Sequence, residues 1–212
     1  MINGGLLLTF RKLISLAGIA TLAACGSQTA DPTNTGFATP SSAGTLSVLD
    51  SVTRDGDVTS PITGNTYAFQ VGSIEGRGLQ GFAGIAPGAT VQEATGSEVA
   101  TLNGTFQVGV IDSVNTSGSL VSGTATSDIG GISLTADFGA GTLTGSGSGI
   151  NPSLNGNTLE IDGTINGDKL SGSATYMGVT GPLDGLVGTD EAIGVFHGHT
   201  DNQLHAGGFI AN

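Results

Sequence analysis

Short stretches in which apolar and polar residues alternate follow one another along most of this chain. A period of two is typical of β-strands that have one buried face and one solvated face. No segment combines the apolar spacing of a helix with capping residues. From residue 66 onward the alternation predicts strands at 66–71, 79–85, 99–111, 119–126, 132–138, 141–148, 158–165, 169–176, 183–188, 193–199 and 206–210.

Turn-forming residues separate these strands. Asn166-Gly167-Asp168 lies between two of them, and Asn and Gly tolerate the positive φ of a tight hairpin. Residues 137–141 and 155–157 indicate further turns. Short turns between successive strands predict an antiparallel meander, and about eight such strands can close into a barrel without exposed edges. We therefore expect an all-β fold, a soluble eight-stranded antiparallel up-and-down β-barrel, with an open sandwich as the alternative.

The N-terminal region has a different character. The basic pair Arg11-Lys12 precedes an apolar run at 13–22 that is too short to span a bilayer, as in a secretory signal peptide. Leu22-Ala23-Ala24-Cys25 then resembles a bacterial lipobox, in which the cysteine is lipidated and becomes the mature N-terminus. Cys25 is the only cysteine, so lipidation accounts for it.

The pattern therefore divides the chain into three parts. We predict a signal peptide at 1–24, a lipidated, disordered tether at 25–44 and a β-barrel domain at 45–212. A strand-like pattern begins near Thr45, although Asp55-Gly56-Asp57 and Ser60-Pro61 indicate turns within it. We expect additional N-terminal strands there, which either complete the barrel or form a separate layer.

Composition narrows the function. Removal of the signal peptide leaves three basic residues against seventeen acidic ones, a net charge near −14. Such a surface repels nucleic acid, so no nucleic-acid partner is expected. Attachment to the membrane would come from lipid on Cys25, and Gly26-Ser27 after it favours the outer membrane.

From about residue 101 to 212 the chain resembles the C-terminal barrel of the transferrin-binding protein B group of surface lipoproteins. The resemblance is carried by Leu102-Asn103-Gly104-Thr105-Phe106, by the Asp137-Phe138 strand end with its glycine turn, and by the closing Ala206-Gly207-Gly208-Phe209-Ile210-Ala211. It implies a surface-exposed lipoprotein that binds a protein or a solute, in a family in which some members capture haem or iron. The chain is too short to contain the lobe with which large members bind transferrin, so that activity is not implied.

All three histidines lie close together in the sequence. His197 and His199 share one face of a predicted strand, and a turn at Asp201-Asn202 could bring His205 beside them. Three imidazoles so placed could bind a divalent transition metal or ligate haem iron, and solvated histidines are the alternative. No other cofactor is indicated.

No residue pattern indicates catalysis. The chain has no nucleophile elbow, and Gly76-Arg77-Gly78-Leu79-Gln80-Gly81 lacks the following helix that a dinucleotide site requires. We expect a non-enzymatic outer-membrane lipoprotein, at the cell surface or facing the periplasm, that binds an extracellular protein or a small solute through barrel loops. Haem or metal capture at the histidines, and a structural or adhesive surface role, are the alternatives.

Overall fold

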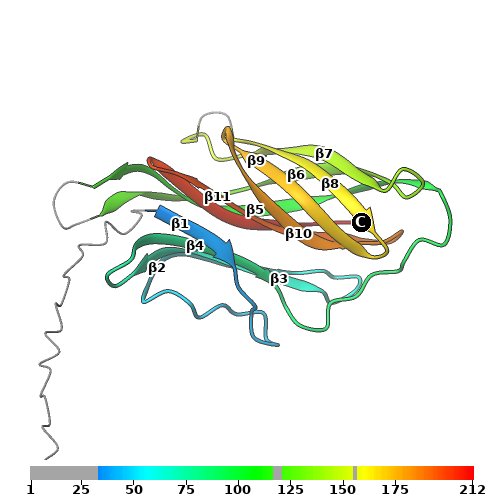
Figure 1. Cartoon of the computed structure of the whole chain (residues 1–212), viewed down its shortest axis with the longest axis horizontal. Helices are drawn as coiled ribbons and strands as arrows, with labels where there is room; N and C mark the ends of the chain where they lie inside the picture. Colours follow the sequence, from blue (N-terminus) through cyan, green and yellow to red (C-terminus); the bar gives the residue numbers. More distant parts are fainter. Residues whose placement is uncertain (1–32, 117–120, 155–156) are drawn as a thin grey trace, which may run out of the picture.

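A computed structural model describes residues 33–116, 121–154 and 157–212, which form a closed barrel and a second, smaller sheet (Figure 1). Each barrel strand pairs antiparallel with the next, and the last pairs with the first. The barrel strands are β5 (Val99–Asn115), β6 (Ser122–Asp137), β7 (Thr142–Gly149), β8 (Thr158–Asn166), β9 (Lys169–Tyr176), β10 (Val179–Val187), β11 (Ala192–Thr200) and β12 (Gln203–Ala211). The eight-stranded antiparallel barrel expected from the sequence is confirmed.

The apolar residues of the alternating strand pattern point inward and fill the barrel. Phe106, Leu134, Leu143, Leu159 and Phe209 are all buried in one cluster. Side chains of this size fill an eight-stranded barrel, so the interior is a packed core. The β8–β9 hairpin turns at Gly167-Asp168 with Gly167 at φ 65°, as the turn residues predict.

One barrel strand differs from its prediction. Strand β6 is continuous, whereas the sequence indicated two strands at 119–126 and 132–138, of which residues 119 and 120 lie outside the described residues. Gly130-Gly131 resembles a break, but Gly130 pairs with Phe106, and a Cβ at Gly130 would lie 2.6 Å from the Phe106 ring. The glycine makes room for an inward phenylalanine and leaves the strand intact.

Four N-terminal strands form a separate layer on the outside of the barrel. Strands β1 (Thr33–Phe37), β4 (Gly78–Ile85), β3 (Thr66–Ile74) and β2 (Ser51–Thr59) follow one another in this order across the sheet. The sheet packs over β11, β12 and β5. A second core fills the interface and contains Tyr67, Phe69, Val71, Leu79, Ala83, Ile111, Ile193, Val195, Leu204, Ala206 and Ile210. The additional strands thus cover the barrel and do not complete it.

Two of these strands were not predicted. Thr33–Phe37, assigned to the tether, forms β1, which pairs parallel with β4 and lacks apolar alternation of its own. Asp55-Gly56-Asp57, interpreted as a turn, lies inside β2. Gly56 is opposite Phe69, whose ring is 2.7 Å from where a Cβ at 56 would stand. Both strands depend on partners distant in sequence, which local pattern does not contain.

A buried carboxylate ties the two layers together. Glu191, in the β10–β11 turn, is fully buried and accepts hydrogen bonds from the turn that follows β2. Its donors are the hydroxyl of Ser60, Thr63 Oγ1 at 2.8 Å and Asn65 Nδ2 at 2.7 Å. Hydrogen bonds to a charged group are the stronger ones, so this contact fixes the sheet against the barrel end.

No helix in the described ranges has the length and apolarity to cross a membrane. Cys25, the predicted signal peptide and the turn at residues 155 and 156 lie outside the described residues.

Candidate functional site

The three histidines do not form one site. His197 pairs with Ala206, and His205 pairs with Gly198. His205 is therefore on the same face as the core residues Phe196 and Phe209, inside the barrel, while His197 and His199 alternate with them and face outward. No cluster of three potential metal-ligating side chains exists among the described residues. The predicted three-histidine arrangement is wrong because His205 has the opposite phase of the alternation.

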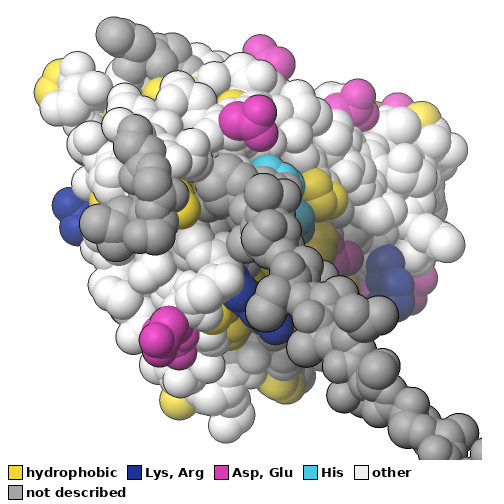
Figure 2. All heavy atoms as spheres, turned by 60° about the vertical axis from the view of Figure 1, so that its left-hand side comes forward, with side chains coloured by type: hydrophobic (Ala, Val, Ile, Leu, Met, Phe, Trp, Pro, Cys, Tyr) yellow, Lys and Arg dark blue, Asp and Glu magenta, His cyan; other side chains and the backbone are white. Residues whose placement is uncertain are grey.

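The outward pair contacts strand β1. Thr35 Oγ1 is 2.8 Å from His197 Nδ1 and 3.1 Å from His199 Nδ1. The Phe37 ring meets the His197 ring edge-on at 4.5 Å between centroids. Figure 2 shows histidine atoms at the surface beside a hydrophobic side chain. Burial lowers the pKa of His197 to about 4, and the neighbouring His199 adds to this, so His197 stays neutral and serves to dock β1 on β11.

The inward histidine is part of an aromatic cluster. The His205 ring lies 5.7 Å from the Tyr176 ring and 5.9 Å from the Phe196 ring, and it is fully buried. Neither ring nitrogen has a hydrogen-bond partner among the described residues. Desolvation lowers the pKa of His205 to about 3, with smaller contributions from His197 and His199. The His205 imidazole is therefore a neutral group of the buried core.

A buried aspartate at the same end of the barrel holds the chain that leaves β7. Asp128 Oδ2 accepts a hydrogen bond of 2.7 Å from the Tyr176 hydroxyl. Asp128 Oδ1 accepts from the backbone N–H groups of Ile129, Ile150 and Asn151 at 2.9 to 3.1 Å. The backbone of Ile150 is therefore fixed by a buried carboxylate.

This arrangement also explains the glycine before Ile150. A Cβ at Gly149 would lie 1.6 Å from Asp128 Oδ2, so a side chain there would displace the carboxylate. Two further bonds hold the same segment: Ile150 N–H donates to Ile129 O at 3.0 Å, and Asn151 Nδ2 donates to Ser127 O at 2.8 Å. The result is a rigid loop start in a segment that emerges from the barrel.

Two isoleucines are exposed here, Ile150 at the start of the loop and Ile129 in β6. Ile150 is 74% exposed and Ile129 is 41% exposed, and they are neighbours through the bond between their backbones. Isolated exposed apolar side chains are common on proteins, but two adjacent ones on a fixed backbone form a ready contact surface.

A groove opens beside these isoleucines, between the N-terminal sheet and the barrel wall. It encloses about 430 Å³, a volume within the usual range of ligand sites. We name it the β2–β6 groove; its lining residues are Asp55, Phe69, Gln107, Ser127, Asp128, Ile129, Ile150 and Asn151. These residues come from β2, β3, β5, β6 and the loop after β7. The groove exists only because the second sheet is laid on the barrel.

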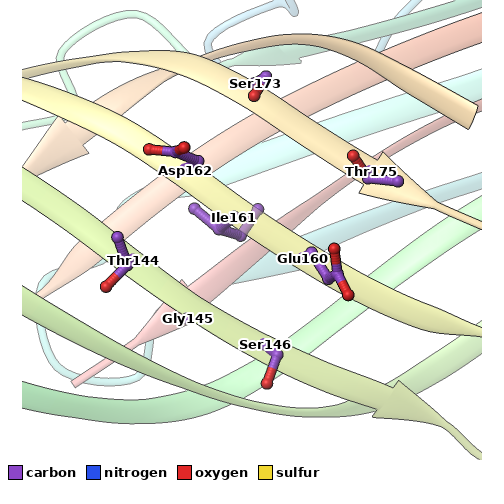
Figure 3. A pocket seen from close by; sticks show the side chains of 8 residues that line it. All are labelled: Thr144, Gly145, Ser146, Glu160, Ile161, Asp162, Ser173 and Thr175. Carbon is purple, nitrogen blue, oxygen red and sulfur yellow. The ribbon is translucent and has the colours of Figure 1, made fainter. Parts of the chain in front are cut away.

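A second hollow lies on the outer surface of the barrel, over β7, β8 and β9. Figure 3 shows the residues that line it. It encloses about 470 Å³, and its side chains are mostly hydroxyls and carboxylates, with Glu160 and Asp162 projecting from the central strand. Such groups are well hydrated, and exchanging water for a ligand gains little. We therefore place the candidate site at the β2–β6 groove.

Sequence reasoning missed the residues of this groove. The alternation did not single out Asp128, although this residue has the same phase as the buried Ile132 and Leu134, which indicates an inward position. Ile129 has the opposite phase, so its apolar side chain was a signal of an exposed contact. Ile150 follows a strand in an irregular segment, where no periodicity is available.

Comparison with known proteins gives matches among solved structures alone. No family model and no curated protein matches the chain. The chain is similar to a structure named surface lipoprotein, with 15% identity, 70% of this chain and 76% of the other covered, and a TM-score of 0.46. It is similar to transferrin-binding protein B of Actinobacillus pleuropneumoniae H49, with 14% identity, 77% and 83% covered, and a TM-score of 0.47.

A third similar structure is the haemoglobin receptor HpuA of Kingella denitrificans, with 18% identity and a TM-score of 0.40. The match covers 71% of this chain and 64% of HpuA. Two of these names, surface lipoprotein and transferrin-binding protein B, belong to the group that the sequence resemblance names.

Proposed function

We propose that this chain is a lipid-anchored protein of the outer membrane, displayed at the cell surface, that binds a partner protein at the β2–β6 groove and catalyses no reaction. The observation that carries the proposal is the exposed Ile150, whose backbone is held by the buried Asp128 beside an open groove. The loop after β7 is one of the barrel loops through which the sequence analysis predicts binding.

The energetics favour a macromolecular partner. Complete burial of an isoleucine contributes about 1.5–3 kcal/mol, and a fixed backbone removes much of the ordering cost of binding. Ile150 and Ile129 line the groove and remain 74% and 41% exposed, so a small solute in the groove would cover them only in part. A protein surface laid across the rim covers both side chains.

Charge restricts the partner. The part of the chain that follows the predicted signal peptide carries three basic residues against seventeen acidic ones. On the face in Figure 2, acidic side chains are spread widely and basic ones are few. A partner with a basic contact surface is attracted and oriented by this field, and an anionic one is repelled.

The anchor rests on Leu22-Ala23-Ala24-Cys25, and one variant tests it. Cys25→Ser removes the acceptor thiol, so we expect the variant to lose its lipid mass and to leave the membrane fraction on extraction. A variant that still sediments with outer membranes, carrying the same modified mass as the wild type, would disprove the anchor. Protease digestion of intact cells then separates the surface from the periplasmic face.

The groove is tested by a matched pair of substitutions. Ile150→Ser removes the proposed contact, and Ile62→Ser alters another exposed isoleucine, 64% exposed, in the turn after β2. Full-length proteins are recovered after cross-linking on intact cells, and the co-purifying proteins are quantified by mass spectrometry. We expect a partner that is present with wild type and Ile62→Ser and falls at least tenfold with Ile150→Ser. Equal recovery with all three would refute the groove.

A further inference from the structure

Strand β2 is an edge of the N-terminal sheet and lies directly beside the groove. Among the described residues it pairs with β3 alone, and its opposite edge has no strand partner. Most of its residues are exposed. An unpaired strand edge presents backbone N–H and C=O groups that can pair with another chain.

The two halves of β2 differ in how this edge is protected. A bulge lies between Val52 and Arg54, and Arg54 Nη2 donates to Ala125 O of β6 at 3.0 Å. A bulge and a bridging charge are usual ways to block edge pairing. From Asp55 to Thr59 the register with β3 is regular, and within the described part of the chain these residues form no bulge and no bridge to β6. The second half of the strand is therefore the open part of the edge.

The alternating side-chain directions of β2 determine which surroundings each face of an added strand would have. Gly56 is opposite Phe69 and Val58 packs against the interface core, so these positions face the barrel. Asp55 and Asp57 alternate with them and are exposed on the other face, and Asp55 also borders the groove. Cross-strand neighbours share a face, so an added strand would place alternate side chains toward Ile129 and Ile150 and the others beside Asp55 and Asp57.

We propose that the 55–59 segment of β2 binds an extended segment of the partner by strand addition. Residues of that segment that face the barrel are apolar and fill the β2–β6 groove, and the alternate residues are lysine or arginine beside Asp55 and Asp57. The proposal rests on the function proposed above and deepens it. Main-chain hydrogen bonds supply affinity, and the two faces supply specificity.

The probe is a nonapeptide of alternating lysine and valine, fluorescently labelled and titrated against the full-length protein in detergent. Two derivatives carry N-methyl groups on all the lysines or on all the valines, which removes the N–H groups along one edge or along the other. A strand uses a single edge to pair with β2. We therefore expect one derivative to lose binding at least tenfold and the other to retain it. Any other pattern, or no binding of the parent peptide, would overturn strand addition.

Variants locate the peptide on the protein. The double variant Asp55→Asn, Asp57→Asn should weaken binding at least threefold and reduce its dependence on salt. Glu160→Gln with Asp162→Asn, in the polar hollow, should have no effect. Equal loss in both double variants would show attraction by net charge alone and contradict the proposal.

The outcomes also separate the two proposals. If the peptide fails while Ile150→Ser still abolishes recovery of the cellular partner, the groove binds in another way and strand addition is refuted. Light scattering tests for self-association: a dimer whose cross-links join residues 55–59 of the two copies would mean that β2 pairs with a second copy of the chain, which also overturns the proposal.

Discussion

Glu191 shows how a single buried carboxylate can join two layers of a molecule. Its donors Ser60, Thr63 and Asn65 all point hydrogens at it. In Glu191→Gln the amide N–H₂ can replace the oxygen that faces the Ser60 and Thr63 hydroxyls, which then accept, so bonds to a carboxylate become weaker bonds between neutral groups. We expect a loss of about 1–3 kcal/mol in the free energy of unfolding, measured with urea. Glu93→Gln, at an exposed position, is the control and should change little.

His205 makes the barrel sensitive to acid. Its folded pKa of about 3 lies below the unfolded value of 6.5, so the unfolded chain takes up a proton first as the pH falls. Stability is complete above pH 6.5 and declines toward pH 3. The slope is about 1.4 kcal/mol per pH unit for this group, and the lowered pKa of His197 acts in the same direction.

Replacement of His205 isolates its share of this dependence. His205→Leu should reduce the decline in unfolding free energy between pH 6.5 and 4.5, measured by urea titration at several pH values. Phe209→Leu alters the same strand and the same interior without a titratable group, and its pH slope should equal that of the wild type. An unchanged slope in His205→Leu would contradict the assignment of a neutral, buried imidazole.

For single residues, the sequence identified the chemically important types but not whether their side chains point into or out of the barrel. It singled out His197, His199 and His205, yet the one-residue change of phase between paired strands separates His205 from the others. It did not distinguish Asp128 from the surface carboxylates. In both cases the missing information was the register of a long-range pairing, which decides the side of the wall on which a polar group lies.

Strand β1 is the first element of the described residues and packs against the barrel strand β11. Thr35 Oγ1 contacts both outward imidazoles, and Thr33 Oγ1 donates to Thr200 O at 2.8 Å. Thr35→Val leaves the buried Nδ1 of His197 without this partner, so we expect β1 to open more often while the barrel stays folded.

Hydrogen exchange measures that opening. In Thr35→Val, peptides that cover 33–37 and the paired 79–83 should exchange about tenfold faster, and those from β7 and β8 should be unchanged. Thr39→Val, at an exposed position after β1, is the matched control. Unchanged protection of 33–37 would show that parallel pairing with β4 holds β1 without the imidazole contacts.

Elements with a local cause were predicted from the sequence, and those with a distant cause were not. The β8–β9 hairpin follows from its own turn residues, and its bounds agree closely with the prediction. Strand β2 needed Phe69 to occupy the space above Gly56, and β1 needed β4 as a parallel neighbour. Glycine in a strand was misinterpreted as a turn when its role was to admit an aromatic ring.

For the whole molecule, the decisive feature is that one side of the barrel is covered and another is not. The covered side has apolar outward residues such as Ile193, Val195 and Leu204, and the open side has the hydroxyls and carboxylates of β7 to β9. The β2–β6 groove lies at the edge of the N-terminal sheet that covers the barrel. The sequence predicted the barrel and its extra strands, but a site made by two layers could not be located without their arrangement.

The central claim is that a partner protein contacts Ile150. The most direct measurement places a photo-cross-linking amino acid at position 150 of the full-length protein on cells, and at Thr164 on the open barrel face as the control. We predict one discrete protein adduct from position 150 and none from position 164, with the adduct lost when Ile129 is also changed to serine. No adduct from position 150, or the same adducts from both positions, would contradict the account.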